Sequence, residues 1–287
     1  MNAPLHFAFR ARNLASTVLL LALLIGASAG LTYWVLGSTA ALWLSVALTL
    51  GAMMWGNAPT GWVLRARRAQ PIDPRQPGGL LALRDELARR AGLQHAPALY
   101  WIPTPQMEAL TVGRGANAAV LLSAGMLRAL SPRELTGVLA HEISHLRNHD
   151  LTLLGVARGV GRFGRFVARF ALFVAVLAIP GLLFSGQPVP WMGLLVLVAA
   201  PRLLIGLERA ISRAREFDAD ASAVELTGDP RALASALARV EAIELRATRW
   251  AAMVAPVTEI PPWLRSHPET QERIARLNAI TARTALV

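Results

Sequence analysis

The 287-residue sequence has no cysteine and no lysine, and charged residues make up only 16% of it. The absence of cysteine excludes a disulfide framework, a thiol nucleophile and a thiolate metal site. The charged fraction is well below the roughly 25% of ordinary soluble domains, and 54% of the residues are hydrophobic. These figures exclude a disordered chain and argue against an entirely soluble protein. The net charge of +11, carried by arginine alone, leaves nucleic acid and a membrane as the two partners to distinguish.

Two long stretches contain no Asp, Glu, Lys or Arg. The first runs from residue 13 to 64 and the second from 170 to 201. One membrane crossing needs about 20 apolar residues, so the first stretch predicts two helices with a turn near Gly37. The second is short for two crossings, but breaks at Pro180–Gly181 and at 185–188 predict a hairpin whose helices extend into the flanking arginine-bearing turns. Together the stretches predict four transmembrane helices.

Each stretch also has a second interpretation. Ala27-Ser28-Ala29 resembles a signal-peptidase site after an apolar segment, which is typical of a cleavable signal peptide. The second apolar span that follows directly favours an uncleaved hairpin. For the second stretch, the alternative is a buried core hairpin.

The positions of the arginines decide between the two partners. Residues 1–76 carry a net charge of +5 and residues 151–215 one of +7, whereas the rest of the chain carries −1. The whole excess flanks the uncharged stretches, which argues against nucleic-acid binding. Under the positive-inside rule, both termini and the polar segments face the cytoplasm.

The polar remainder predicts a cytoplasmic domain in two halves. We expect an N-terminal transmembrane hairpin over residues 1–64 and a basic linker over 65–76. The first half of the domain follows over 77–157, then a second transmembrane hairpin over 158–209 and the second half of the domain over 210–287. Helical periodicity and start and stop signals predict helices over 79–92, 132–149, 202–226, 230–250 and 268–282. Short apolar runs between turns predict strands over 98–102, 109–112 and 118–122. The fold class is therefore a mainly α membrane protein with an α+β domain that contains a small sheet.

The helix over 132–149 has the clearest start signal in the chain. Ser131, Pro132 and Glu134 form the pattern of a capping box with proline at the first helical position. The motif His-Glu-Ile-Ser-His follows at 141–145 on the same helix.

This motif predicts a zincin-type metallopeptidase. His141 and His145, four residues apart, share one helix face and can bind one ion. Glu142 is placed to accept a proton from a water that such an ion polarises.

A catalytic zinc needs a third protein ligand. Leu151 stands where the third histidine of a metzincin would be, which excludes that class. The segment 215–220 instead offers Glu216 as ligand, and Asp220, one turn later, as acceptor for the free ring N–H of a ligating histidine. We expect Asp218 to be solvated.

Two other side chains near these motifs are weaker candidates. His149 lies one turn beyond His145, and the two turns from His141 to His149 span about 11 Å, too far for one ion without distorting the helix. We expect His149 to be solvated or locally hydrogen-bonded. We expect Glu208 to pair with a neighbouring arginine.

The segments HEISHLRNHD, EFDAD and SHPETQERI, with the two apolar hairpins, resemble the HtpX-type membrane metallopeptidases, relatives of the CaaX prenyl proteases. The resemblance extends over nearly the whole chain. It implies one zinc ion held by His141, His145 and Glu216, with Glu142 as general base and Asp220 in support. It also implies a multi-pass protein of a bacterial inner membrane that cleaves membrane or misfolded proteins in quality control and the stress response.

The late His-Pro…Arg segment has a counterpart in the family. The resemblance therefore implies active-site support near the oxyanion for His267 and Arg273. The chain departs from the family pattern at His149, often a glycine, and at 107–110, where the family has an Asn-Ala-Phe-Ala-like strand. We expect a substrate strand to pair with the edge near 108–113, where it would contact Glu108, Ala109, Leu110 and Thr111.

Spacing predicts where the site lies. If the last span ends near Leu207, Glu216 follows nine residues later, about 13 Å along a helix, just under the membrane surface. We therefore expect the lipid bilayer and membrane proteins as partners, and no nucleic acid. Three alternatives stay open: a CaaX-type prenyl protein protease, which four spans disfavour; an inactive zinc-binding membrane scaffold, which Glu142 disfavours; and a basic nucleic-acid binder.

Overall fold

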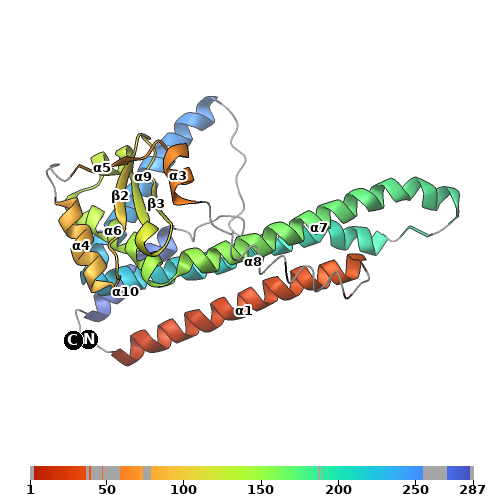
Figure 1. Ribbon diagram of the computed structural model, residues 1–287, viewed down its shortest axis with the longest axis horizontal. Coiled ribbons are helices and arrows are strands. Elements are labelled where there is room, and N and C mark those ends of the chain that lie inside the picture. Colours follow the sequence, from red (N-terminus) through yellow and green to blue (C-terminus); the bar gives the residue numbers. More distant parts are fainter. Residues whose placement is uncertain are drawn as a thin grey trace. The chain divides into compact units, whose positions relative to one another are not determined.

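A computed structural model of the chain describes residues 3–36, 39, 47, 59–73, 79–186, 188–189, 191–254 and 270–284 (Figure 1). In these ranges the helices are α1 (Ala3–Leu36), α3 (Thr60–Ala66), α4 (Leu80–Arg90), α5 (Ala124–Ala129), α6 (Pro132–Arg147), α7 (Asp150–Phe184), α8 (Trp191–Thr227), α9 (Pro230–Val254) and α10 (Thr270–Thr284). The strands are β1 (Gln70–Pro71), β2 (Ala98–Ile102), β3 (Ala109–Val112) and β4 (Ala119–Ser123), and a 3-10 turn covers Gly115–Asn117. The described residues fall into two compact units. One contains 3–36 and 152–214, and the other contains the described parts of 59–151, 215–254 and 270–284.

The first unit consists of apolar helices. Segments of α1, α7 and α8 share a core that includes Leu24, Val160 and Leu204. At Gly164 the helices approach closely, because an added Cβ would lie 2.6 Å from Leu204 Cδ1. Among the described residues, α7 is the one helix long and apolar enough to cross a membrane, and a shorter apolar segment, Ala15–Leu31, lies within α1.

The structure therefore supports the expected membrane helices only in part. Most of the second half of the predicted N-terminal hairpin falls on residues 40–46 and 48–58, which lie outside the described residues. Helices α7 and α8 stand where the second hairpin was predicted. The break predicted at Pro180–Gly181 is wrong, because α7 continues to Phe184. A proline removes one helical hydrogen bond, and an apolar helix of this length tolerates that loss.

The second unit is an α+β domain built on a four-stranded sheet. The strand order is β1-β2-β4-β3, with β2 and β4 parallel and the other two pairs antiparallel. The three predicted strands are present within one residue of their expected bounds, whereas β1, only two residues long, was not predicted. In the described part of the chain, no strand pairs with the outer edge of β3.

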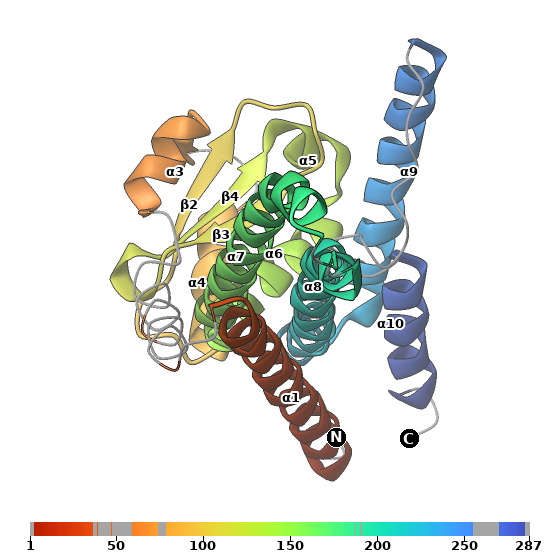
Figure 2. The ribbon, with the colours of Figure 1, turned by 90° about the vertical axis from the view of Figure 1, so that its right-hand side faces the viewer.

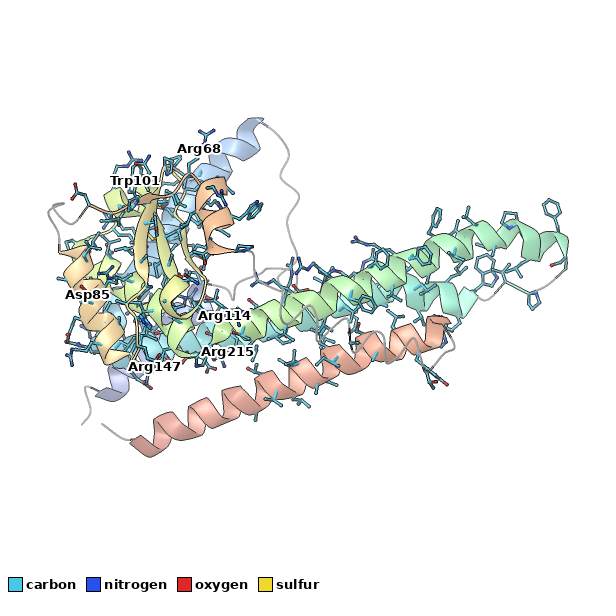
Figure 3. The ribbon with its side chains drawn as sticks, in the orientation of Figure 1. Arg68, Asp85, Trp101, Arg114, Arg147 and Arg215 are labelled. Carbon is cyan, nitrogen blue, oxygen red and sulfur yellow. The ribbon has the colours of Figure 1, made fainter. Side chains whose placement is uncertain are left out.

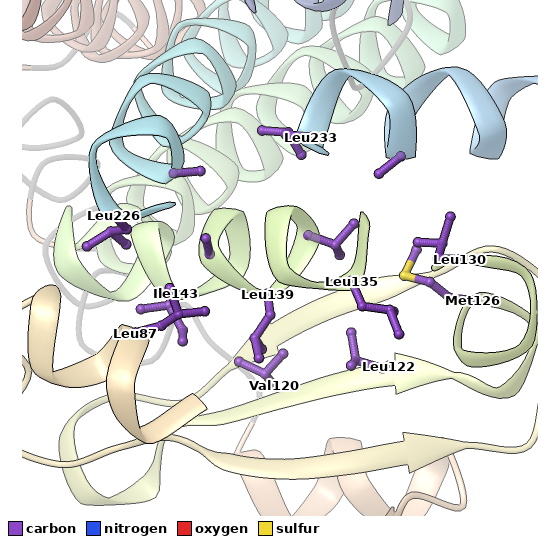
Figure 4. Packing of buried hydrophobic residues seen from close by; sticks show 14 of the residues in the cluster. Leu87, Val120, Leu122, Met126, Leu130, Leu135, Leu139, Ile143, Leu226 and Leu233 are labelled. Atoms are coloured by element: carbon purple, nitrogen blue, oxygen red, sulfur yellow. The ribbon is translucent and has the colours of Figure 1, made fainter. Parts of the chain in front are cut away.

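Helix α6 packs on this sheet and carries the histidine motif. Leu135, Leu139 and Ile143 of α6 share a core with Val120 and Leu122 of β4 (Figure 4). The core fixes which face of α6 is buried, and therefore the direction in which the histidines point.

The two ends of α6 differ in how far the sequence predicted them. The capping box is confirmed: Ser131 Oγ accepts the Glu134 N–H, and the Glu134 carboxylate accepts the Ser131 N–H at 2.8 Å. The helix ends at Arg147, two residues early, because His149 adopts a left-handed φ of 56°. A residue in that conformation ends an α-helix, and no glycine marks the position. The chain then starts α7 at Asp150.

The rest of the unit places α8, α9 and α10 around α6. Helix α8 ends at Thr227, before Gly228 with its φ of 70°, as predicted. At Gly137 of α6 an added Cβ would lie 2.8 Å from the Leu233 nitrogen of α9, so only glycine permits this helix contact. Helices α9 and α10 contact each other, and in Figure 2 α10 lies below α9.

Candidate metal centre

Helix α6 brings two imidazoles together. The Nε2 atoms of His141 and His145 lie 3.2 Å apart, with the rings edge to face. The third group comes from α8: Glu216 Oε2 lies 3.5 Å from His141 Nε2, and Glu216 Oε1 lies 3.8 Å from His145 Nε2. One ligand atom from each of the three residues falls within 4.8 Å of the others, and this is the one such group found in the described ranges.

These distances fit a zinc ion. Two nitrogens each 2.0–2.1 Å from a tetrahedral zinc are about 3.3 Å apart, and the two Nε2 atoms are separated by 3.2 Å. Two histidines and one glutamate form a known catalytic donor set, which leaves a fourth position for water or substrate. The three residues expected to ligate the metal are therefore brought together with suitable donor atoms.

Asp220 and Arg273 lie behind His141. Asp220 Oδ1 is 2.9 Å from His141 Nδ1 and accepts a hydrogen bond from it, as expected for the support of a ligating histidine. Arg273, from α10, binds the same carboxylate with two nitrogens, at 2.8 and 2.6 Å, and lies 3.2 Å from Glu216 Oε2. Its Nη2 is also 3.4 Å from His141 Nδ1. We interpret this as a contact only, because Nδ1 already donates to the nearer Asp220.

His145 has a carboxylate of its own that the sequence reasoning missed. Asp150 Oδ2 lies 2.7 Å from His145 Nδ1, and Arg215 Nε donates to the other oxygen of Asp150 at 2.6 Å. Asp218, which we expected to be solvated, is buried and accepts a hydrogen bond from Arg215, so that prediction is wrong. On a continuous helix, an aspartate five residues after a histidine lies on a different face. The turn at His149 places Asp150 next to His145.

The predicted general base lies beside the edge strand. Glu142 is 8% exposed, and the Thr111 hydroxyl of β3 donates to its Oε2 over 2.5 Å. Of the four residues expected to contact substrate, Thr111 thus touches the motif. Glu108 pairs with Arg67 at 3.0 Å, just before β3 begins.

The remaining candidates lie elsewhere. His149 is exposed and is not one of the three grouped side chains. Glu208 pairs with Arg165 at 2.6 Å in the first unit, which confirms the expected arginine partner. His267 lies outside the described residues, so its role stays a prediction.

The buried charges control how the site titrates. Burial alone would raise the pKa of Asp220, but Arg273 and His141 outweigh it and hold that pKa below its usual value. Burial likewise opposes the charged form of His141, yet the hydrogen bonds to Asp220 and Glu216 raise the pKa of His141 to about 10. In the metal-free protein, His141 is therefore a cation that shares its charge with two carboxylates.

This pKa predicts opposite pH trends for stability and for metal binding. In the unfolded chain a histidine titrates near 6.5, so protonated His141 stabilises the metal-free fold fully below about pH 6.5. That contribution is lost as the pH rises toward about 10. Metal has to displace the proton, so zinc affinity is expected to rise about tenfold per pH unit in this window. Competition with a chelator of known protonation measures this zinc affinity. A zinc affinity that does not change between pH 7 and pH 9 would contradict the raised pKa of His141.

Comparison with known proteins shows the family. Residues 74–281 match the sequence profile of peptidase family M48. A "Protease HtpX homolog" of Gemmatimonas aurantiaca is 35% identical over 86% of this chain and 90% of its own length, and one of Acaryochloris marina is 36% identical over 92% and 94%. The chain belongs to peptidase family M48. This M48 protein is accordingly a protease, and its His-His-Glu group fits metal binding.

A solved structure also aligns with this M48 chain. The crystal structure of S. mikatae Ste24p aligns with a TM-score of 0.48 and 19% identity, over 82% of this chain and 56% of the other. The family assignment rests on the sequence matches and not on this likeness.

Proposed function

We propose that this M48 protease is a zinc-dependent endopeptidase embedded in a bacterial inner membrane, with its active site on the cytoplasmic side. The observation that carries the proposal is the group of buried His141, half-buried His145 and buried Glu216, with Glu142 next to the first histidine in sequence. When bound, zinc would act as a Lewis acid that polarises the scissile carbonyl and lowers the pKa of a bound water. His141, His145 and Glu216 would hold it.

The protein side chains then handle the protons. Glu142 accepts a proton from the attacking water and delivers it to the leaving amine, as a general base that becomes a general acid. The Thr111 hydroxyl holds one oxygen of the Glu142 carboxylate and so limits its rotation. Asp220 and Arg273 keep His141 in place from behind. We extend the proposal to support of the oxyanion by His267.

The charge distribution supports the proposed membrane insertion and orientation. The proposal includes four spans, of which α7 has the required length and composition. The net charges of +5 and +7 beside the uncharged stretches support a cytoplasmic position for both termini and for the catalytic residues. The short sequence distance from Leu207 to Glu216 favours membrane proteins and membrane-adjacent segments as substrates, cleaved in protein quality control.

Metal removal tests the proposal. A chelator is expected to abolish cleavage of a membrane-protein substrate in liposomes, and stoichiometric zinc is expected to restore it. Cleavage that persists in the chelated, metal-free protein would refute a metalloprotease. Equal turnover of a soluble unfolded chain and the membrane substrate would refute the proposed preference.

A groove lined in part by the residues just before β3 would give the substrate chain a place to lie. It has a volume of about 670 Å³, with Met107 and Glu108 on one side and Ile243 and Ala247 of α9 on the other. Glu108 precedes Thr111 by three residues, or about 10 Å along a strand. A substrate strand paired with the outer edge of β3 would therefore reach the groove about three residues away from its scissile peptide bond, which would lie next to Glu142.

Filling the groove is expected to weaken substrate binding without changing the chemistry. Ala247→Trp should raise KM for peptides longer than about six residues several-fold and leave kcat unchanged. Ala242→Trp, at another exposed position of α9 that does not line the groove, is the matched control. An unchanged KM for Ala247→Trp would place the substrate elsewhere.

A further inference from the structure

A buried chain of hydrogen bonds runs from the second histidine to α8. His145 Nδ1 contacts Asp150 Oδ2 at 2.7 Å, and Asp150 Oδ1 accepts from Arg215 Nε at 2.6 Å. Arg215, labelled in Figure 3, also donates to Asp218 through Nη1. Asp150 is 1% exposed and Arg215 is 6% exposed, so water does not take the place of these contacts.

We propose that Asp150, oriented by Arg215, is the positioning residue of His145. A neutral imidazole carries one N–H, and the nitrogen that lacks it is the one able to bind a metal. When Nδ1–H donates to Asp150, the Nε2 lone pair points at His141 Nε2 and Glu216, where the other donor atoms converge. Asp220 has this role for His141 alone, and the structure gives no contact between Asp220 and His145.

The backbone explains how Asp150 reaches this position. On a continuous helix, residue 150 would lie about 500° around the axis from His145, on a different face. The left-handed His149, with φ of 56°, ends α6 and starts a new helix at Asp150. Asp150 occupies the first turn of α7, where a carboxylate is also favoured by the helix dipole.

Arg215 links the positions of two proposed metal ligands, His145 and Glu216. It immediately precedes Glu216 on α8, so the helix that presents the carboxylate ligand also carries the cation that fixes Asp150. A guanidinium donates from several nitrogens in one plane, which lets Arg215 hold Asp150 and Asp218 at the same time. Displacement of α8 would therefore disturb His145 as well as Glu216.

The test compares two aspartates that share one arginine. The inference rests on the proposed metal site, so zinc affinity is measured first for the wild-type full-length protein in detergent, by competition with a chelator. In Asp150→Asn the side chain has one acceptor oxygen in place of two. It therefore cannot accept the hydrogen bonds of both His145 and Arg215 in the observed arrangement. We expect its zinc affinity to fall about 10- to 100-fold. Asp218→Asn removes a buried negative charge beside Arg215, although the amide oxygen can still accept the Arg215 N–H, and it leaves His145 its partner, so we expect less than about a threefold change.

A second measurement needs no substitution. In wild-type protein labelled with ¹⁵N-histidine and loaded with ¹¹³Cd, we expect cadmium coupling at Nε2 of His145 and a proton on Nδ1. Cadmium coupling at Nδ1 overturns the inference, as does equal zinc affinity for Asp150→Asn and wild type, or an equal loss for both asparagine variants. A wild-type protein that binds neither zinc nor cadmium refutes the proposed metal site itself, which is a different failure.

Discussion

Replacing Glu142 by glutamine is expected to reduce kcat by about 10²- to 10⁴-fold, the range for loss of a positioned general base. The amide has nearly the same shape and can still accept the Thr111 hydrogen bond, so the side chain should keep its place. It cannot take a proton from water at neutral pH. Zinc content should stay equal to wild type, because the donor atoms of the metal group come from His141, His145 and Glu216.

The same helix supplies a matched control for this variant. Glu134→Gln makes the identical chemical change at another buried glutamate of α6, where glutamine can still close the capping box with Ser131. We expect its kcat to stay within about twofold of wild type. Full activity in Glu142→Gln would show that a different group moves the proton. Equal losses in both variants would show that the helix, and not the base, had been damaged.

Replacing Arg273 by leucine is expected to have the largest effect on stability. Arg273 is 7% exposed and lies against Asp220 and Glu216, so its removal takes one cation from these two buried carboxylates and leaves them with protonated His141 in the metal-free protein. Breaking a buried ion pair from one side typically costs about 3–5 kcal/mol of folding free energy. We expect the metal-free variant to lose stability in this range, and added zinc to restore part of it, since the ion supplies positive charge beside Glu216.

Chemical denaturation of the metal-free and zinc-loaded forms measures both effects. Arg276→Leu is the matched control, one turn along α10, where the arginine makes an exposed pair with Glu272 and lies over the Phe217 ring. Exposed pairs and single cation–π contacts are each worth about 1 kcal/mol or less. Equal stability of the two leucine variants would show that Arg273 is not needed to balance the buried carboxylates.

The elements that the sequence predicted well have local signals. The capping box at Ser131, the stop at Gly228 and the short apolar runs between turns each depend on residues close together in the chain, and each element lies within a few residues of its predicted bounds. The pair of histidines follows from helical spacing alone. Strand β1 has only Gln70 and Pro71, and two residues cannot show a period.

The partners of the histidines depend on contacts that spacing does not encode. Asp150 reaches His145 only because His149 takes a left-handed conformation, which histidine adopts less readily than glycine or asparagine. Arg215 and Asp218 come from another helix, and a charged pair three residues apart usually faces solvent. For Arg273 the resemblance implied support of the active site, and its observed contacts are with Asp220 and Glu216 behind the metal group.

Helix α8 carries Arg215, Glu216 and Asp220 within six consecutive residues and without a break. Each residue added to or removed from a helix turns everything beyond it by about 100° and shifts it by about 1.5 Å. One inserted residue between Glu216 and Asp220 would therefore aim the aspartate away from His141, even if every side chain were retained. The length of this segment is as much a requirement of the site as its composition. Relatives that keep the chemistry should vary by substitution here, and never by insertion or deletion.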